Sequence, residues 1–239
     1  PWTNQGTATS SYAALTGMVA PAAGTVRTWR LVTTCTASSS SANSTTGTFT
    51  SAVTYCTPTS WDPDGLYINR VAFVGTLADP PVNTSTFNAT GFQNFTTLPV
   101  KAIQAQGEGI NIVARSNGTV HVRGTWKAWV DWNKNGTFQP ATEEVYNIQG
   151  FAGADATFGF VIPPTTPPGD YRIRIRVNNG TDLLGGETFG FDFLPCDNFT
   201  SGLTDNYGET EDYLFTVVAA CNANIVTAPN GERCGTGTV

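Results

Sequence analysis

Alternation of apolar and polar residues is the strongest pattern in this chain. Across residues 120–132, apolar residues take every second position, while His121, Arg123 and Lys127 lie on the opposite face. Residues 171–177 alternate in the same way, with arginines on one face and isoleucine and valine on the other. A period of two is typical of a strand with one buried face. The sequence therefore predicts long, half-buried strands in both regions.

Further strands are expected at residues 28–34, 46–54, 67–75, 110–115, 157–162 and 212–218. Asn117 and Gly118 stand between two of the predicted strands, and an Asn-Gly pair there predicts a hairpin. Helical periodicity is nearly absent, because the best candidate, residues 10–18, is short and contains Gly17. Many short strands separated by Gly, Pro and Asn turns predict an all-β fold, an antiparallel β-sandwich of immunoglobulin-like or jelly-roll-like type.

Composition narrows the function classes. The 239 residues carry a net charge of −6 and only 13% charged side chains, which argues against a nucleic-acid-binding face. No apolar run approaches the length of a membrane-spanning segment, so no membrane span is expected. The single histidine, His121, leaves no material for a histidine-based metal site. The composition is typical of an extracellular β protein.

Five cysteines are too widely spaced to form a metal knuckle: Cys35, Cys56, Cys196, Cys221 and Cys234. In a polar, threonine-rich chain they indicate an oxidising compartment and disulfides. Their odd number leaves at least one thiol free or paired outside this chain. Because the sequence opens with neither a methionine nor a signal-like segment, we expect a processed piece or a piece of a longer protein.

One loop has the spacing of a calcium site. Asp131, Asn133 and Asn135 alternate, Gly136 follows, and Glu143 lies downstream. Such a loop supplies oxygen ligands from alternate positions, and its glycine permits the sharp turn. Only one of the first three ligands is charged, which predicts weak binding. The alternative is a turn that satisfies its own hydrogen bonds without a metal.

Two other constellations could bind or act on a sugar. Trp129 lies on the polar face of its predicted strand and is the best candidate for stacking on a glycan, whereas Trp126 and Trp132 lie on the apolar face. Glu209 and Glu211, together with the aspartate of the calcium-like loop, could form the carboxylate pair of a glycoside hydrolase. Pairing of these acids with the arginines of residues 171–177 is the favoured alternative, so no catalytic residue is expected.

An ordered series of motifs resembles the GEVED domain, a module of large secreted and cell-surface proteins of Bacteroidetes. The series reads YCTP, YINRVAF, GFQNFT, AWVDWNKNGTF, GDYRIRIRV and finally GETED, across residues 54–218. The resemblance implies an outer-surface protein exported by the type IX route, with no activity of its own. It also carries the calcium loop onto Asp131, Asn133, Asn135 and Glu143.

The flanks resemble pieces of immunoglobulin-like adhesin repeats, in TWRLVTTC before residue 36 and in APNGERCGTGTV near the end. This resemblance implies three parts: the C-terminal part of a preceding repeat at 1–53, the GEVED-like sandwich at 54–218, and a linker with the start of the next repeat at 219–239. Cys56 and Cys196 bracket the middle part and form the expected intrachain disulfide. Cys35 and Cys234 then have partners outside this chain, and Cys221 is unassigned.

These observations predict a non-enzymatic structural or adhesive module of a large extracellular adhesin or filament. Its expected partners are neighbouring repeats or copies of the same protein and surface glycans, and its expected cofactor is Ca²⁺. The alternative is a carbohydrate-binding ancillary domain of a secreted hydrolase, using Trp129 and the calcium loop.

Overall fold

The computed structural model describes residues 26–32, 44–50, 53–61, 65–117, 124–151, 155–178, 193–199 and 207–220. The chain divides into two units, Pro1–Tyr55 and Cys56–Val239. In the first unit, strand β1 (Val26–Val32) pairs antiparallel with β2 (Ser44–Thr50). The predicted repeat start near Cys234 lies outside the described residues. The immunoglobulin-like character of both flanks stays a prediction.

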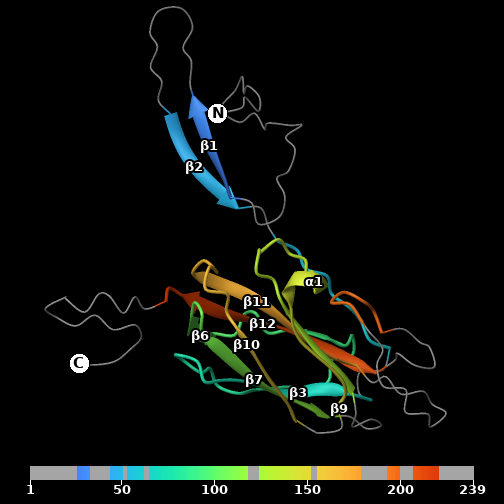
Figure 1. Cartoon of the computed structure of the whole chain (residues 1–239). Coiled ribbons are helices and arrows are strands. Elements are labelled where there is room, and N and C mark those ends of the chain that lie inside the picture. Colours follow the sequence, from blue (N-terminus) through green and yellow to red (C-terminus); the bar gives the residue numbers. More distant parts are fainter. Residues whose placement is uncertain are drawn as a thin grey trace, which may run out of the picture. The chain divides into compact units, whose positions relative to one another are not determined.

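The described residues of the second unit form two β-sheets (Figure 1). The larger sheet has the order β5 (Phe92–Asn94), β12 (Gly208–Val218), β11 (Gly169–Asn178), β8 (Gly124–Val130) and β9 (Glu144–Phe151), and β6 (Ala102–Ala105) also pairs with β12. The smaller sheet has the order β10 (Asp155–Val161), β7 (Gly109–Asn117), β3 (Tyr67–Val74) and β4 (Asn83–Thr84). A short helix, α1 (Pro140–Glu143), precedes β9. The predicted β-sandwich is confirmed, although β5 and β6 run parallel to β12.

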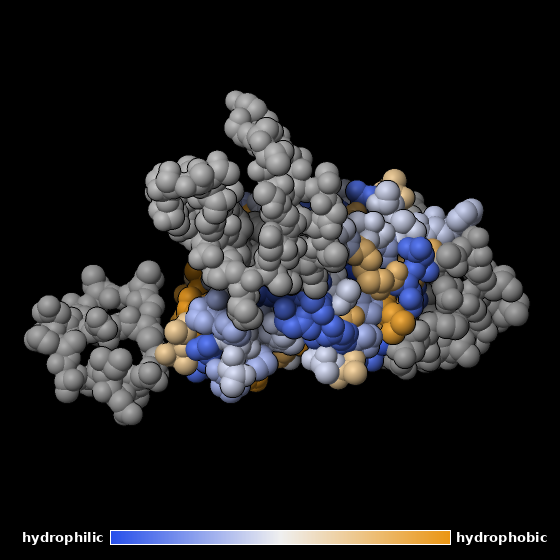
Figure 2. Space-filling model, turned by 90° about the horizontal axis from the view of Figure 1, so that it is seen from above, coloured by the Kyte–Doolittle hydropathy of each residue, from blue (hydrophilic) through white to orange (hydrophobic). Residues whose placement is uncertain are grey.

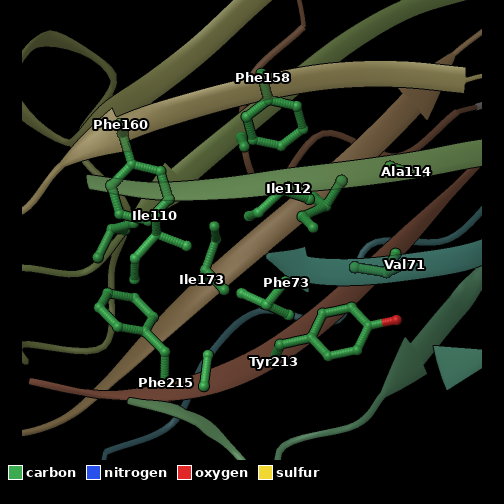
Figure 3. Packing of buried hydrophobic residues seen from close by; sticks show 14 of the residues in the cluster. Val71, Phe73, Ile110, Ile112, Ala114, Phe158, Phe160, Ile173, Tyr213 and Phe215 are labelled. Carbon is green, nitrogen blue, oxygen red and sulfur yellow. The ribbon is translucent and has the colours of Figure 1, made fainter. Parts of the chain in front are cut away.

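The hydrophobic core lies between the two sheets. Ile110 and Ile112 of β7 and Phe158 and Phe160 of β10 face Phe215 and its neighbours across the interior (Figure 3). The buried hydrophobic residues of β7, β10 and β12 recur at every second position, so the alternation in the sequence decides which face of each strand is buried. No helix in the described ranges is long and apolar enough to cross a membrane.

The predicted hairpin at Asn117 and Gly118 is wrong. Strand β7 pairs with β3 and β10 in the smaller sheet, whereas β8 pairs with β11 and β9 in the larger one. The apolar faces of both strands belong to one core. The two strands therefore pack across the sandwich and not edge to edge, because that arrangement buries both apolar faces at once.

Gly208 at the start of β12 has no room for a side chain. Its φ is +156°, and a Cβ would lie 2.4 Å from the carbonyl oxygen of Val177 and 2.7 Å from the ring of Phe199. We expect Gly208→Ala to lower the free energy of unfolding by about 1–3 kcal/mol in urea titrations, since backbone strain and overlap both oppose the alanine. Gly109→Ala is the matched control, because its Cβ would meet only Phe160 O at 3.8 Å. Equal losses in the two variants would contradict this explanation.

Candidate functional site

Strands β11 and β12 carry different chemistry on their two faces. The register pairs Arg174 with Asp212 and Ile175 with Glu211. The face that points away from the smaller sheet, here called the outer face, carries Arg172, Arg174, Arg176 and Asp212. The inner face carries the two glutamates of the GETED motif together with core residues.

A buried ion-pair network crosses the outer face. Nε and Nη2 of Arg174 donate to the two carboxylate oxygens of Asp212 at 2.7 and 2.8 Å, and both side chains are fully buried. Arg172 Nη2 lies 2.9 Å from the same carboxylate. For Asp212, this confirms the interpretation that acids of the motif pair with the arginines of β11. A buried charge pair of this kind needs good geometry to offset its desolvation, and the two-pronged contact provides it.

Two chain segments cover the outer face. Residues 56–60 and 193–199, here called the cover, are joined by a disulfide between Cys56 and Cys196, as the family resemblance implied. Arg174 donates to the carbonyl oxygens of Cys56 (2.7 Å) and Pro195 (2.8 Å). Arg176 donates to the carbonyl oxygens of the neighbouring residues 194 and 197. The arginines therefore hold the cover from beneath.

Aromatic rings from the cover and from the segment after β8 pack against the arginines. The guanidinium carbon of Arg174 lies 4.8 Å from the ring centre of Phe138, and that of Arg176 lies 4.3 Å from the ring centre of Phe199. Such cation–π contacts gain strength when they are desolvated. The sequence did not predict this role for the two arginines, because their partners in the cover are backbone carbonyls, which leave no motif.

Trp129 is not available to a glycan. It lies on the outer face, as the alternation predicted, but it is fully buried. Its ring packs edge-on against Phe193 of the cover at 6.1 Å between ring centres. The prediction of sugar stacking by Trp129 is therefore wrong, because this polar face is covered by protein. Trp126 lies in the core as expected, and Trp61 is the tryptophan with 67% exposure.

The two inner-face glutamates are fully buried and hydrogen-bonded. Glu209 accepts hydrogen bonds from Ile68 N and Gln93 Nε2, both at 2.8 Å. Burial raises the pKa of Glu209 to about 7. Burial, and then the negative charge of Glu209, raises the pKa of Glu211 to about 8, although hydrogen bonds from Tyr213 and Ser85 oppose the shift. Both carboxyls therefore bind protons far more readily than an exposed glutamate.

The hydrogen bonds around Glu211 also accommodate a proton on its carboxyl. Ser85 Oγ lies 2.9 Å from Ile68 O and 2.8 Å from Glu211 Oε1, yet a serine hydroxyl has one hydrogen. A protonated Glu211 can donate to Ser85, which then donates to Ile68. Tyr213 OH accepts from Asn83 Nδ2 and donates to the other glutamate oxygen at 2.6 Å. This network joins β12 to β3 and β4.

The carboxylates of the hydrolase alternative are not brought together. Glu209 and Glu211 lie on the inner face of the larger sheet. Asp131 follows β8 in the alternation that places Trp129 on the outer face, and its backbone N–H donates to Arg172 O. The two motif glutamates and Asp131 therefore do not flank one cleft, as cleavage of a glycosidic bond between two carboxyls requires.

The loop after β8 is closed by its own hydrogen bonds. Asp131 is fully buried and accepts from Asn135 N (3.2 Å) and Gly136 N (3.0 Å). Asn133 Oδ1 accepts from Asn135 N, and Asn135 Oδ1 accepts from Thr137 N. Gly136 has a φ of 86°, which permits the turn. These bonds match the metal-free interpretation of the loop.

Glu143 carries an unsatisfied oxygen beside this loop. Its Oε2 accepts from Gln139 N at 2.8 Å, while its buried Oε1 has no hydrogen-bond partner. Burial, and also the negative charge of Asp131, raises the pKa of Glu143. Among the described residues no cluster of three or more His, Cys, Asp or Glu side chains could hold a metal. A cation here would therefore depend on amide oxygens from Asn133 and Asn135 as well as the two carboxylates.

The described surface offers a cavity of limited size. It is lined mainly by apolar residues, among them Val71, Phe73, Phe95, Leu98 and Tyr213, and has a volume of about 20 Å³. That is room for a single water molecule and not for a sugar ring. Figure 2 shows a face on which hydrophilic and hydrophobic residues are mixed.

Comparison with known proteins identifies one family. No curated protein matches the chain. The family model of the GEVED domain matches residues 125–216, which run from β8 to β12. The match includes the outer-face arginines, the loop at residues 131–143 and the GETED motif, and it confirms the resemblance found in the sequence. Residues 125–216 of this chain are therefore similar to the GEVED domain.

Proposed function

We propose that this chain is a non-enzymatic structural module of an extracellular adhesin or surface filament, and that its loop at residues 131–143 binds calcium. The GEVED match indicates a module of extracellular Bacteroidetes-type proteins. The observation that supports a structural role is that Glu209, Glu211 and Asp212 of the motif all use their carboxyl groups in buried bonds to other parts of the same chain. Residues used in this way stabilise a scaffold and are not free to act on a substrate.

The disulfide suits a module that carries tension. Cys56 is the first residue of its unit, and Cys196 lies before the final strand, with a sequence separation of 140. A force applied to the two ends of the chain passes through the S–S bond, so the residues between the cysteines are not extended. Strands β3 to β11 lie within this closed loop. The cross-link therefore limits how far the module can lengthen.

Single-molecule pulling tests this role. With the disulfide intact, we expect the chain to lengthen on unfolding by about 500 Å less than after reduction, because each extended residue spans about 3.6 Å. The control is a Cys56→Ser/Cys196→Ser double variant, which should lengthen fully with or without a reductant. Equal lengthening of the oxidised and reduced wild-type chain would contradict a tension-limiting cross-link.

The alternatives are tested with the same purified chain. A structural module should turn over neither glycosides, esters nor peptides, and should leave a glycan array unlabelled. Specific sugar binding that survives Trp129→Ala would favour a carbohydrate-binding module. Turnover that is lost in Glu209→Gln, with the fold intact by circular dichroism, would overturn the non-enzymatic assignment.

Calcium binding is supported by the buried, unpartnered Glu143 Oε1 next to a loop of alternating oxygen side chains. Ca²⁺ takes six to eight oxygen ligands, and extracellular sites of this kind bind with dissociation constants of about 0.1–1 mM. A cation beside Asp131 and Glu143 would also offset the repulsion between their carboxylates. Backbone carbonyls and water supply the remaining ligands in such loops.

We expect calcium to stabilise the folded chain. At a concentration about ten times the dissociation constant, a ligand that binds only the folded state adds about 1.4 kcal/mol, which raises the melting temperature by about 3–6 °C. Differential scanning calorimetry with calcium and with magnesium measures the shift. Glu143→Gln should abolish it, whereas Asp170→Asn, a change at an exposed acid paired with Lys101, should not. A melting temperature that does not respond to about 10 mM calcium would overturn the site.

A further inference from the structure

The disulfide of the cover lies against a buried cation. Arg174 is fully buried, and its Nη1 lies 2.8 Å from Cys56 Sγ but 3.9 Å from Cys196 Sγ. Cys56 is half-buried, whereas Cys196 is exposed. The two sulfur atoms therefore differ in both their charge environment and their accessibility.

This asymmetry controls how the bond can break. Thiol–disulfide exchange proceeds by attack of a thiolate on one sulfur, and it is faster when the other sulfur leaves as a stabilised thiolate. A neighbouring arginine lowers the pKa of a cysteine and stabilises its thiolate. Arg174 and Arg176 contact the cover, Arg172 lies on the same face, and Asp212 accepts from Arg172 and Arg174. Cys56 is therefore the better leaving group and Cys196 the sulfur open to attack.

We infer that Cys56–Cys196 is an exchangeable cross-link whose acceptor atom is Cys196 Sγ and whose partner is a cysteine-type thiol. The incoming thiolate forms a new S–S bond to Cys196 while the bond between Cys196 and Cys56 breaks. The bonding electron pair leaves with Cys56, which becomes a thiolate next to Arg174 Nη1. The incoming sulfur is oxidised, Cys56 is reduced, and no other reactant is needed.

Two sources can supply such a thiol. One is a low-molecular-weight thiol, which would cap Cys196. The other is a second copy of this chain, since the sequence contains three further cysteines, Cys35, Cys221 and Cys234, outside the described residues. Exchange between copies would convert a cross-link within one module into a covalent bond between modules.

The site of attack can be measured on the wild-type chain. After incubation with glutathione at neutral pH and acid quenching, peptide mass spectrometry should find the adduct on Cys196 in at least about threefold excess over Cys56, as expected when the leaving thiol has a pKa about one unit lower and the exchange rate follows that pKa with a slope of about 0.5. In a parallel experiment, a concentrated sample of the chain is treated with a trace of glutathione, which is then removed. Mass spectrometry searches this sample for disulfides between Cys196 and a cysteine of a second copy. Such disulfides identify the second source, and an adduct on Cys196 alone identifies the first. Adducts on Cys56, or none on either cysteine, overturn the inference.

A pair of single variants tests the role of the arginine. Cys196→Ser leaves Cys56 as a thiol beside Arg174, and Cys56→Ser leaves Cys196 as an exposed thiol. Alkylation of each cysteine is followed on its own peptide as a function of pH. The pH midpoint of alkylation should lie at least about one unit lower for Cys56 than for Cys196, and an ordinary cysteine has a pKa of about 8.5. Equal midpoints, or a higher one for Cys56, contradict a stabilised leaving group. The sulfur that is attacked in the wild-type chain is measured separately, so a variant that misfolds does not decide the test of the inference.

Discussion

Arg174→Met should lower the free energy of unfolding by about 3–5 kcal/mol, measured by urea titration with the disulfide intact. The variant removes both hydrogen bonds to the fully buried carboxylate of Asp212. It also leaves the carbonyl oxygens of Cys56 and Pro195 without the donor that now holds the cover. Each buried group that loses its partner adds a desolvation cost, and methionine replaces the volume of arginine without replacing its bonds.

A surface ion pair provides the control for this variant. Lys101 Nζ lies 2.6 Å from Asp170, close to the 2.7 Å contact of Arg174 with Asp212, but the two side chains are 30% and 44% exposed. Solvent screens such pairs, so Lys101→Met should cost less than about 1 kcal/mol. If the two variants lose the same stability, the buried network is not what holds the cover to the sheet.

The different outcomes at Trp129 and Trp126 show what alternation can predict. Alternation assigned each tryptophan to the correct face of β8, because the side-chain period of a strand is fixed by its backbone. It could not reveal that the outer face is covered, since the cover comes from residues about 70 positions away on either side and has no period of its own. For the same reason, the sequence identified the motif carboxylates but did not show that the outer and inner faces use them differently.

Strand pairing was less predictable than strand position. The longest strands, such as β11 and β12, were found from their patterns because each contains several repeats of the apolar–polar alternation. The two- to four-residue strands β4, β5 and β6 are too short to show a period. The partner of β7 depends on burial across the whole sandwich, which outweighs the local turn preference of Asn117 and Gly118.

The stability of the chain should fall as the pH rises from about 5 to about 8. The folded-state pKa values of Glu209 and Glu211 are raised to about 7 and about 8, above the 4.5 of an ordinary glutamate. Between these values the folded chain holds more protons than the unfolded chain, so each added pH unit costs up to about 1.4 kcal/mol for each carboxyl that is protonated only in the folded state. The stabilisation is fully present at low pH and is lost as the pH passes through the folded-state values.

Glu211→Gln isolates the larger contribution. The amide cannot titrate, so urea titrations at several pH values should show a slope shallower by about 1 kcal/mol per pH unit between about pH 6 and 8. Asp155→Asn is the control, because a hydrogen bond from Arg115 lowers the pKa of Asp155 and places its titration below this range. The variant should keep the wild-type slope.

A spectroscopic measurement tests the protonation state of Glu211 independently of stability. At about pH 6, the wild-type chain should show infrared absorption from the buried protonated carboxyls of Glu209 and Glu211, and Glu211→Gln should show it weakened to the contribution of Glu209. That proton lets Ser85 bond to both neighbours, because its single hydroxyl hydrogen cannot satisfy both Ile68 O and Glu211 Oε1. An absorption that is equally strong in the wild-type chain and in Glu211→Gln, together with an unchanged slope, would mean that Glu211 is ionised in the fold. The network around Ser85 would then require a different hydrogen-bond arrangement.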